Sequence, residues 1–213
     1  MIAPCLLAAL IAYLVGSFPT GVLIGRLYGV DPRMVASGRT GGTNVYRAAG
    51  PFAGMITGVF DLIKGIMALL LVSHFISALP LALVVAGLAV VIGHNCSVCI
   101  GFRGGAGTMT NSGVVLFIFW PAFLVLGLLT VLTLRVTRMA SIASMVFALG
   151  VPMAFMIAGS QEYISWTFLL YGLGQAIIIF WSLRPNIKRL LVGNERIIGS
   201  QRMDRKPVRQ IGI

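Results

Sequence analysis

Long uncharged segments alternate with short basic segments along this chain of 213 residues. A helix needs about 20 apolar residues to cross the hydrocarbon core of a membrane. Five segments without Asp, Glu, Lys or Arg reach that length, at residues 1–25, 65–102, 104–134, 139–161 and 163–183. The pattern therefore predicts an all-α, polytopic integral membrane protein. Only 10% of the residues are charged, against about a quarter in soluble domains, which excludes an ordinary soluble fold.

The hydropathy of these segments predicts six helices, since residues 65–102 can hold the end of one helix and all of the next. They are expected near residues 4–25, 48–72, 79–93, 112–134, 139–158 and 163–182. An even number of crossings places the basic loop 26–47 and the basic segment 184–209 on opposite sides of the membrane. The positive-inside rule favours the cytoplasm for both. Six crossings therefore conflict with the charge pattern.

The uncharged segment 104–134 offers a seventh crossing, because Pro121 lies near its centre. We expect two short segments, about 108–120 and 122–134, as tilted helices or as a re-entrant pair that lines a cavity. About seven crossings put the N-terminus outside and the C-terminus in the cytoplasm. A single kinked helix that violates the charge rule is the alternative. The predicted organisation is a membrane domain over residues 1–195 and a basic cytoplasmic tail over 196–213.

The net charge of +11 does not indicate a nucleic-acid-binding protein. The basic residues lie in short loops and a tail between apolar segments, where anionic membrane lipid explains them better. Cys5, Cys96 and Cys99 are too few for a disulfide framework, and we expect no metal or redox role for the C-x-x-C formed by the last two.

The first basic loop has the composition of an anion-binding site. Its sequence, just before an expected helix, is Ser37-Gly38-Arg39-Thr40-Gly41-Gly42-Thr43-Asn44-Val45-Tyr46-Arg47. Glycines let consecutive backbone N–H groups point into one concavity, and a helix N-terminus adds its dipole. Short polar side chains and a guanidinium complete a site that a phosphate would fit. A flexible polar turn is the other interpretation.

Two further basic segments belong to the same predicted membrane face. One is the glycine-rich loop 101–108, which contains Arg103 and suggests a second phosphate site. The other is the segment 184–195, in which Asn186 and Arg189 are three residues apart and so share a helical face. A basic tail attracted to anionic lipid is the competing interpretation of this last segment.

Two charged residues interrupt the second expected helix. Asp61 and Lys64 have the i, i+3 spacing of a helical pair, and each would be costly alone in an apolar setting. We therefore expect them to pair, for a functional or a purely structural purpose. His94, at the end of the third helix, is a candidate general base or a capping donor.

Together these residues form four motifs that occur in order over about residues 10–195. They are Ser37-Gly38 with Gly41-Gly42-Thr43-Asn44-Val45 and Arg47, Asp61-x-x-Lys64-Gly65, Gly93-His94 with Gly101-Phe102-Arg103-Gly104-Gly105-x-Gly107, and Asn186-Ile187-x-Arg189-Leu190 with Gly193-x-Glu195. This set resembles the PlsY family of bacterial membrane acyltransferases. The resemblance implies a seven-helix enzyme of the bacterial inner membrane whose active site faces the cytoplasm.

What the resemblance implies about function is specific. Such an enzyme transfers an acyl chain from acyl phosphate to the sn-1 hydroxyl of glycerol 3-phosphate and forms lysophosphatidic acid for phospholipid synthesis. The expected partners are these two substrates and membrane lipid, with no cofactor, no metal and no nucleic acid. The oligomeric state is not implied.

The resemblance also assigns roles to residues. The expected catalytic residues are Ser37, Arg47 and Asn186. The expected phosphate-binding residues are Gly38, Arg39, Gly41, Thr43, Asn44, His94, Arg103, Gly104, Gly105 and Gly107. The expected supporting residues are Asp61, Lys64, Arg189 and Glu195.

Four positions depart from the family pattern. They are Ala106 in place of the lysine of G-G-K-G, Leu183 in place of a histidine, Ser97 in place of a proline and Ala36 in place of a glycine. One hypothesis is that Arg39, where the family usually has a small polar residue, supplies the charge missing at position 106. The alternatives to an active enzyme are a weakened paralogue that binds phosphate or phospholipid, and an anion transporter.

Overall fold

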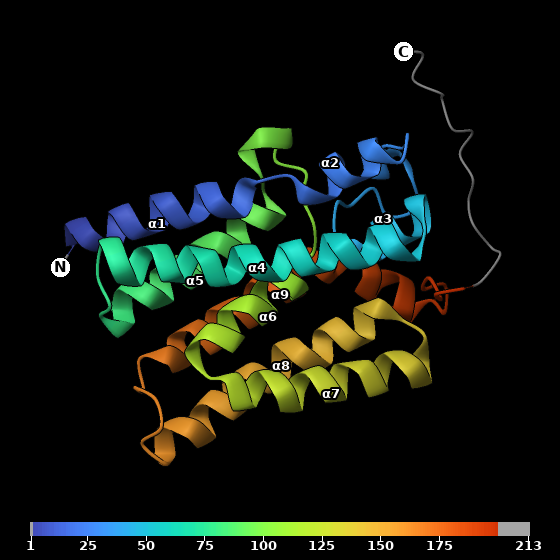
Figure 1. Ribbon diagram of the computed structural model, residues 1–213. Coiled ribbons are helices and arrows are strands. Elements are labelled where there is room, and N and C mark those ends of the chain that lie inside the picture. Colours follow the sequence, from blue (N-terminus) through green and yellow to red (C-terminus); the bar gives the residue numbers. More distant parts are fainter. Residues whose placement is uncertain (1, 200–213) are drawn as a thin grey trace.

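The computed structural model describes residues 2–199 and is all-helical over that range, as predicted (Figure 1). Residues 200–213 of the expected basic tail lie outside the described residues. The helices are α1 Ile2–Ser17, α2 Thr20–Leu27, α3 Gly42–Ala49, α4 Pro51–Phe75, α5 Pro80–Asn95, α6 Thr108–Ile118, α7 Trp120–Thr137, α8 Ala140–Ser160 and α9 Phe168–Leu191, with short 3-10 turns at Pro32–Met34 and Val98–Ile100.

Within residues 2–199, six helical stretches are long and apolar enough to cross a membrane, and this confirms a polytopic membrane protein. They are α1 with α2, α4, α5, α7, α8 and α9, while α6 is a shorter apolar helix. The uncharged segment 104–134 is divided as Pro121 predicted, because α6 ends at Ile118 and α7 starts at Trp120. In Figure 1 the chain reverses direction between α6 and α7. The single kinked helix is therefore not what forms.

Two of the expected helix boundaries differ most from the structure. The first helix is interrupted at Pro19, since proline lacks the N–H that an α-helix needs and its ring clashes with the preceding turn. The last helix continues through Pro185 and ends at Leu191, although the sequence suggested an end near residue 182. Lys188 and Arg189 lie in its last turn, where cations interact favourably with the helix dipole.

Glycines let the long helices pack with their backbones in contact. A Cβ atom at Gly16 of α1 would lie 2.1 Å from the carbonyl oxygen of Val90 on α5. On the other side of the bundle, a Cβ at Gly113 of α6 would lie 2.0 Å from the carbonyl oxygen of Leu62 on α4. Small residues are the usual means of close helix association in membranes, where apolar surface gives little drive to associate. The glycine-rich composition thus serves packing as well as the loops.

Four segments that are distant in the sequence meet at one end of the bundle. The amide of Thr40 in the first loop donates to the carbonyl of Gly104 in the second loop, at 3.3 Å. The amide of Ile198, beyond α9, donates to the carbonyl of Arg138 in the α7–α8 turn, at 2.8 Å. The fold therefore brings the motif-bearing segments together around one end of α4, α5 and α9 (Figure 1).

Candidate functional site

A pocket of about 210 Å³ lies at this end of the bundle. Eleven of the residues selected from the sequence line it, namely Ser37, Arg39, Gly41, Thr43, Asn44, Arg47, Asp61, His94, Gly107, Asn186 and Glu195. The others do not line it, namely Gly38, Lys64, Arg103, Gly104, Gly105 and Arg189. Most of the expected catalytic and phosphate-binding set is thus gathered around one cavity.

The first motif is partly helical, whereas the sequence suggested a loop that precedes a helix. Helix α3 starts at Gly42, so Thr43, Asn44 and Arg47 project from its two turns. Its start lies against α4, because a Cβ at Gly42 would be 2.8 Å from the carbonyl oxygen of Gly54. This tertiary packing stabilises a helix whose own residues are poor helix formers.

Asn44 holds the first loop rather than facing a phosphate. Its buried amide Nδ2 donates to the carbonyls of Pro32 at 2.6 Å, Val35 at 3.1 Å and Arg39 at 2.7 Å. Its Oδ1 accepts the backbone N–H of Ser37 at 3.2 Å. The amide has no donor left for a ligand. Asn44 therefore shapes the loop that carries the residues on either side.

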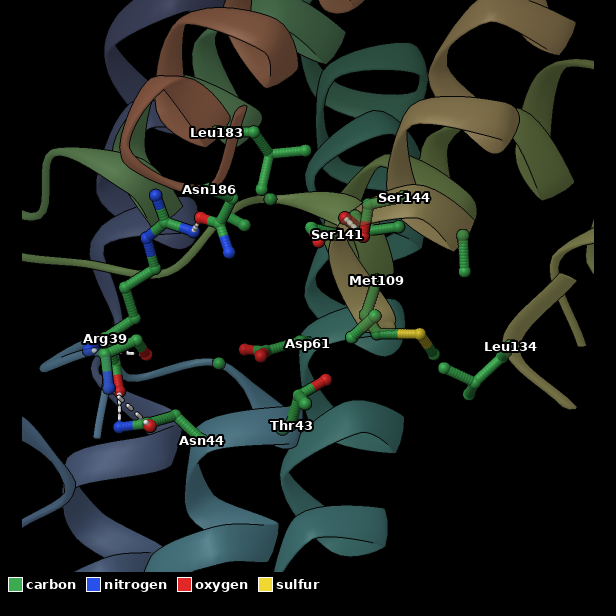
Figure 2. A pocket seen from close by; sticks show the side chains of 18 of the residues that line it. Arg39, Thr43, Asn44, Asp61, Met109, Leu134, Ser141, Ser144, Leu183 and Asn186 are labelled. Atoms are coloured by element: carbon green, nitrogen blue, oxygen red, sulfur yellow. Dashed lines mark hydrogen bonds between the residues drawn. The ribbon is translucent and has the colours of Figure 1, made fainter. Parts of the chain in front are cut away.

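Arg39 crosses the pocket to reach α9. Its guanidinium donates to Oδ1 of Asn186 at 2.8 Å and to the carbonyl of Ser182. Figure 2 shows Arg39 reaching Asn186 at the left of the pocket. Burial lowers the pKa of this guanidinium below its ordinary value, because water solvates the cation poorly there. Leu183, at the position of the family histidine, lines the same part of the pocket.

Arg47 and Arg39 give the pocket its charge. Asp61 is paired with Lys64 at 3.0 Å and Glu195 with Arg189 at 3.0 Å, so both carboxylates are compensated. In the described part of the chain, neither pocket arginine has a carboxylate within ion-pair distance. Burial lowers the pKa of Arg47 as well, which reflects the cost of a cation that water reaches poorly. A pocket with two uncompensated guanidinium groups is suited to an anion.

Glu195 fixes the amide of Asn186 from the side opposite Arg39. Its Oε1 accepts from Asn186 Nδ2 at 2.7 Å and from the Ser141 hydroxyl at 3.1 Å. Its Oε2 accepts from Arg189 Nε at 3.0 Å. Asn186 and Arg189 thus share a helical face, as their spacing predicted. With Oδ1 held by Arg39 and Nδ2 held by Glu195, the orientation of the Asn186 amide is determined, and one of its N–H bonds stays available for a ligand.

The glycines of the second loop are required by packing against α5. A Cβ at Gly104 would lie 1.9 Å from the His94 carbonyl oxygen, and one at Gly105 would lie 2.0 Å from His94 Nε2. Their amides donate to the carbonyls of Asn95 at 3.0 Å and His94 at 3.1 Å. These two N–H groups are therefore occupied by backbone carbonyls of α5. Arg103 is exposed and lies outside the pocket.

Gly107 is the glycine of this loop that reaches the pocket. Its φ of 88° is in the left-handed region that favours glycine, and it precedes the first residue of α6. Ala106, at the position of the family lysine, and Thr108 line the pocket on either side of it. The N-terminus of α6, with the positive end of its dipole, therefore borders the cavity.

Sequence reasoning overlooked the wall that α7 and α8 supply. Thr130 and Leu134 come from α7, and Ala140, Ser141, Ala143 and Ser144 come from α8, with Met109 of α6 beside them. Small polar residues such as Ser141 and Ser144 in otherwise apolar helices were the available signal. This wall is mostly apolar and extends the charged pocket into the region between the helices (Figure 2).

The fold and the pocket define a class: a polytopic helical membrane protein with an arginine-lined cavity at one end of its bundle. The family model for glycerol-3-phosphate acyltransferase matches residues 6–193. The chain therefore belongs to the glycerol-3-phosphate acyltransferase family, which confirms the resemblance of its motifs to PlsY.

Individual relatives are similar over nearly their whole length. The glycerol-3-phosphate acyltransferase of Rubrobacter xylanophilus is 37% identical over 195 residues, 92% of this chain and 96% of the relative. That of Lactiplantibacillus plantarum is 37% identical over 193 residues, 89% of each chain. The crystal structure of PlsY, an integral membrane glycerol 3-phosphate acyltransferase, in its glycerol 3-phosphate form has a TM-score of 0.81 at 34% identity and covers 92% of this chain and 96% of that one. The lysophosphatidic acid form has a TM-score of 0.79 at 33% identity, covering 92% of this chain and 95% of that chain.

Proposed function

We propose that this membrane acyltransferase moves an acyl chain from acyl phosphate to the sn-1 hydroxyl of glycerol 3-phosphate and releases lysophosphatidic acid and phosphate. The observation that carries the proposal is the pair of pocket guanidinium groups, Arg39 and Arg47, without a carboxylate partner among the described residues. Both substrates are phosphate anions, and one of them has a long apolar chain.

The shape of the pocket supports an acyl phosphate as donor. Its charged part is bordered by Arg39 and Arg47, and its other wall is formed by apolar residues of α6, α7 and α8, including Met109 and Leu134. A phosphate head can lie against the arginines while the acyl chain extends between these helices towards the lipid. A soluble sugar phosphate alone would not need that apolar wall.

The chemistry requires position and charge compensation more than a covalent intermediate. Acyl phosphate is a mixed anhydride, so the sn-1 oxygen can attack its carbonyl carbon directly. The bond from that carbon to the phosphate oxygen breaks, and the hydroxyl proton leaves with the phosphate. Preorganised cations and donors lower such a barrier by stabilising the charge that develops on the leaving phosphate. We assign this role to Arg47, Arg39 and Ser37, and the orientation of glycerol 3-phosphate to Asn186.

The remaining expected residues have supporting roles in this proposal. Glu195 and Arg189 hold Asn186, and Asn44 holds the first loop. Lys64 keeps the buried Asp61 paired. Gly107 and Thr43 shape the phosphate end of the pocket.

The proposed location is the bacterial inner membrane, with seven passes, the N-terminus outside and the pocket facing the cytoplasm. Support comes from the direction of the chain in Figure 1, where α6 and α7 run in opposite directions and count as two passes. Helix α6 has 11 residues, about 16 Å, so it passes through only part of the hydrocarbon core. The positive-inside rule then places the arginine-rich end in the cytoplasm.

Donor specificity tests the reaction. The purified protein is supplied with glycerol 3-phosphate and one of three donors: palmitoyl phosphate, palmitoyl-CoA or palmitoyl carrier protein. We expect lysophosphatidic acid with palmitoyl phosphate alone. Product from either thioester, in the absence of palmitoyl phosphate, would contradict the proposed donor.

A further inference from the structure

One carboxylate oxygen in the pocket wall has no hydrogen-bond partner in the described structure. It is Oδ2 of Asp61, on α4. The side chain is only 1% exposed, yet the residue lines the pocket, and Figure 2 shows the carboxylate pointing into the cavity on the side where Arg39 and Asn186 lie. A buried hydrogen-bond acceptor without a partner is unfavourable in free energy, so we expect a bound ligand to supply the missing donor.

The other oxygen of this carboxylate is fully engaged. Oδ1 accepts from the Thr20 hydroxyl at 2.5 Å and lies 3.0 Å from Lys64 Nζ and 3.5 Å from His94 Nδ1. The groups come from α2, α4 and α5, so three helices fix the carboxylate in one orientation. Oδ2 is therefore a rigid hydrogen-bond acceptor that faces the cavity. Lys64, which does not line the pocket, balances the charge of the carboxylate.

The chemistry of the pocket limits what this oxygen can contact. A phosphate would be repelled by a carboxylate oxygen at hydrogen-bond distance, because both carry negative charge. A neutral donor is therefore required, and the hydroxyl groups of glycerol 3-phosphate are the neutral donors in the proposed reaction. The reacting sn-1 hydroxyl loses its proton as the ester forms, whereas the secondary hydroxyl keeps its proton throughout.

We propose that Asp61 Oδ2 accepts a hydrogen bond from the secondary hydroxyl of glycerol 3-phosphate and so selects a glycerol phosphate over phosphates that lack this group. The inference rests on the proposed function and adds a specificity residue to it. A contact that is the same in the ground state and the transition state contributes to binding of the acceptor rather than to the rate of the chemical step.

A substrate that lacks only the secondary hydroxyl tests the contact. Propane-1,3-diol monophosphate retains the phosphate and a primary hydroxyl. We expect wild-type protein to favour glycerol 3-phosphate over this analogue by roughly 10- to 100-fold in kcat/KM, as expected for one hydrogen bond to a charged group. In Asp61→Asn, Lys64 and Thr20 keep the amide oxygen on their side, so an NH₂ donor faces the cavity. The NH₂ can still donate to the hydroxyl oxygen, but this neutral hydrogen bond is weaker, so the preference should fall to roughly a few-fold through a higher KM for glycerol 3-phosphate, with KM for palmitoyl phosphate unchanged.

Two further variants separate this role from a structural one. Asp61→Leu with Lys64→Met removes the buried pair as a whole, so no charge is left unpaired, and it should lose the preference. Thr20→Val removes a donor to Oδ1 but keeps Oδ2, and it should keep the preference even where it lowers stability. Equal losses of kcat with both acceptors in Asp61→Asn, or a lost preference in Thr20→Val, would overturn the proposal.

Binding makes the result independent of turnover. Dissociation constants of glycerol 3-phosphate and of the analogue are measured by thermal stabilisation of the same proteins. An inactive wild type would contradict the proposed reaction, while the comparison of the two dissociation constants would still decide the role of Asp61. Wild-type protein that binds both acceptors equally would refute it.

Discussion

Arg39 stands where the family usually has a small polar residue, and replacing it with alanine separates its contribution to catalysis from its contribution to stability. The side chain makes two hydrogen bonds to neutral acceptors, Oδ1 of Asn186 and the carbonyl of Ser182. Because the charged guanidinium is only half-buried and water screens it, each bond contributes about 1 kcal/mol, and Arg39→Ala should cost about 2 kcal/mol of stability. A fully exposed arginine would contribute little to stability, but Arg39 is half-buried, so its removal should lower the stability measurably.

The expected loss of activity is larger. Removing one preorganised donor from a developing negative charge typically lowers kcat roughly 100- to 1000-fold, about 2.7–4 kcal/mol of barrier. Arg39→Ala also frees Oδ1 of Asn186, so the amide is held from the Glu195 side alone. The assay is formation of lysophosphatidic acid from palmitoyl phosphate and labelled glycerol 3-phosphate, beside a thermal unfolding measurement. Arg103→Ala is the matched control, because that arginine is exposed and outside the pocket, and it should retain activity.

Rescue tests whether Arg39 replaces the cation missing at position 106. Ala106 lines the pocket, so a lysine there can reach the same cavity. Ala106→Lys should restore at least tenfold activity to Arg39→Ala, which corresponds to about 1.4 kcal/mol of barrier. If Arg39→Ala has wild-type activity and Ala106→Lys changes nothing, the reasoning about a relocated cation is refuted.

Two other substitutions are predicted from the contacts. Glu195→Gln weakens the hydrogen bonds that Glu195 accepts from Arg189 and Asn186. We therefore expect kcat to fall by roughly tenfold while KM for palmitoyl phosphate changes little. An unchanged kcat in steady-state kinetics would contradict this. Gly105→Ala places a methyl group 2.0 Å from His94 Nε2, so we expect a loss of about 1–3 kcal/mol of stability and a lower midpoint of thermal unfolding. Gly29→Ala is the control for backbone strain alone, because a Cβ there meets no atom within 4 Å although the φ of Gly29 is 71°.

Hydropathy predicted the long helices because a helix that faces lipid must be apolar over its whole length. This requirement does not depend on how the helices pack against one another. Pro121 divided α6 from α7 as expected, since proline cannot donate the helical hydrogen bond. Pro19 divides α1 from α2 for the same reason, but the apolar residues on both sides made the segment look continuous. Patterns of composition thus locate membrane passes better than the breaks within them.

The candidate site was predicted less completely. Glycines in the first and third motifs are compatible both with a phosphate-binding loop and with close packing, and only interatomic distances distinguish the two uses. The contact of Gly105 with His94, and the amides of Gly104 and Gly105 that donate to α5, assign these glycines to packing. The contact between Arg39 and Asn186 joins residues 147 positions apart, and no local pattern reports such a contact.

The topology can be tested with single-cysteine reporters in a background from which Cys5, Cys96 and Cys99 have been removed. Met34 in the first loop, Leu191 at the end of α9 and Tyr163 between α8 and α9 are all exposed. An impermeant thiol reagent should label positions 34 and 191 from the cytoplasmic side and position 163 from the outside. Labelling of positions 34 and 191 from opposite sides would contradict seven passes.

In the proposed reaction, the arginine-lined pocket holds two phosphate substrates while an acyl group passes from one to the other. The most direct measurement is the stoichiometry of the purified wild-type protein with palmitoyl phosphate and labelled glycerol 3-phosphate, beside the Arg47→Ala variant. We expect equal amounts of lysophosphatidic acid and inorganic phosphate from wild type, and at least a roughly 100-fold lower rate from the variant. Phosphate release without lysophosphatidic acid, or equal rates from both proteins, would contradict it.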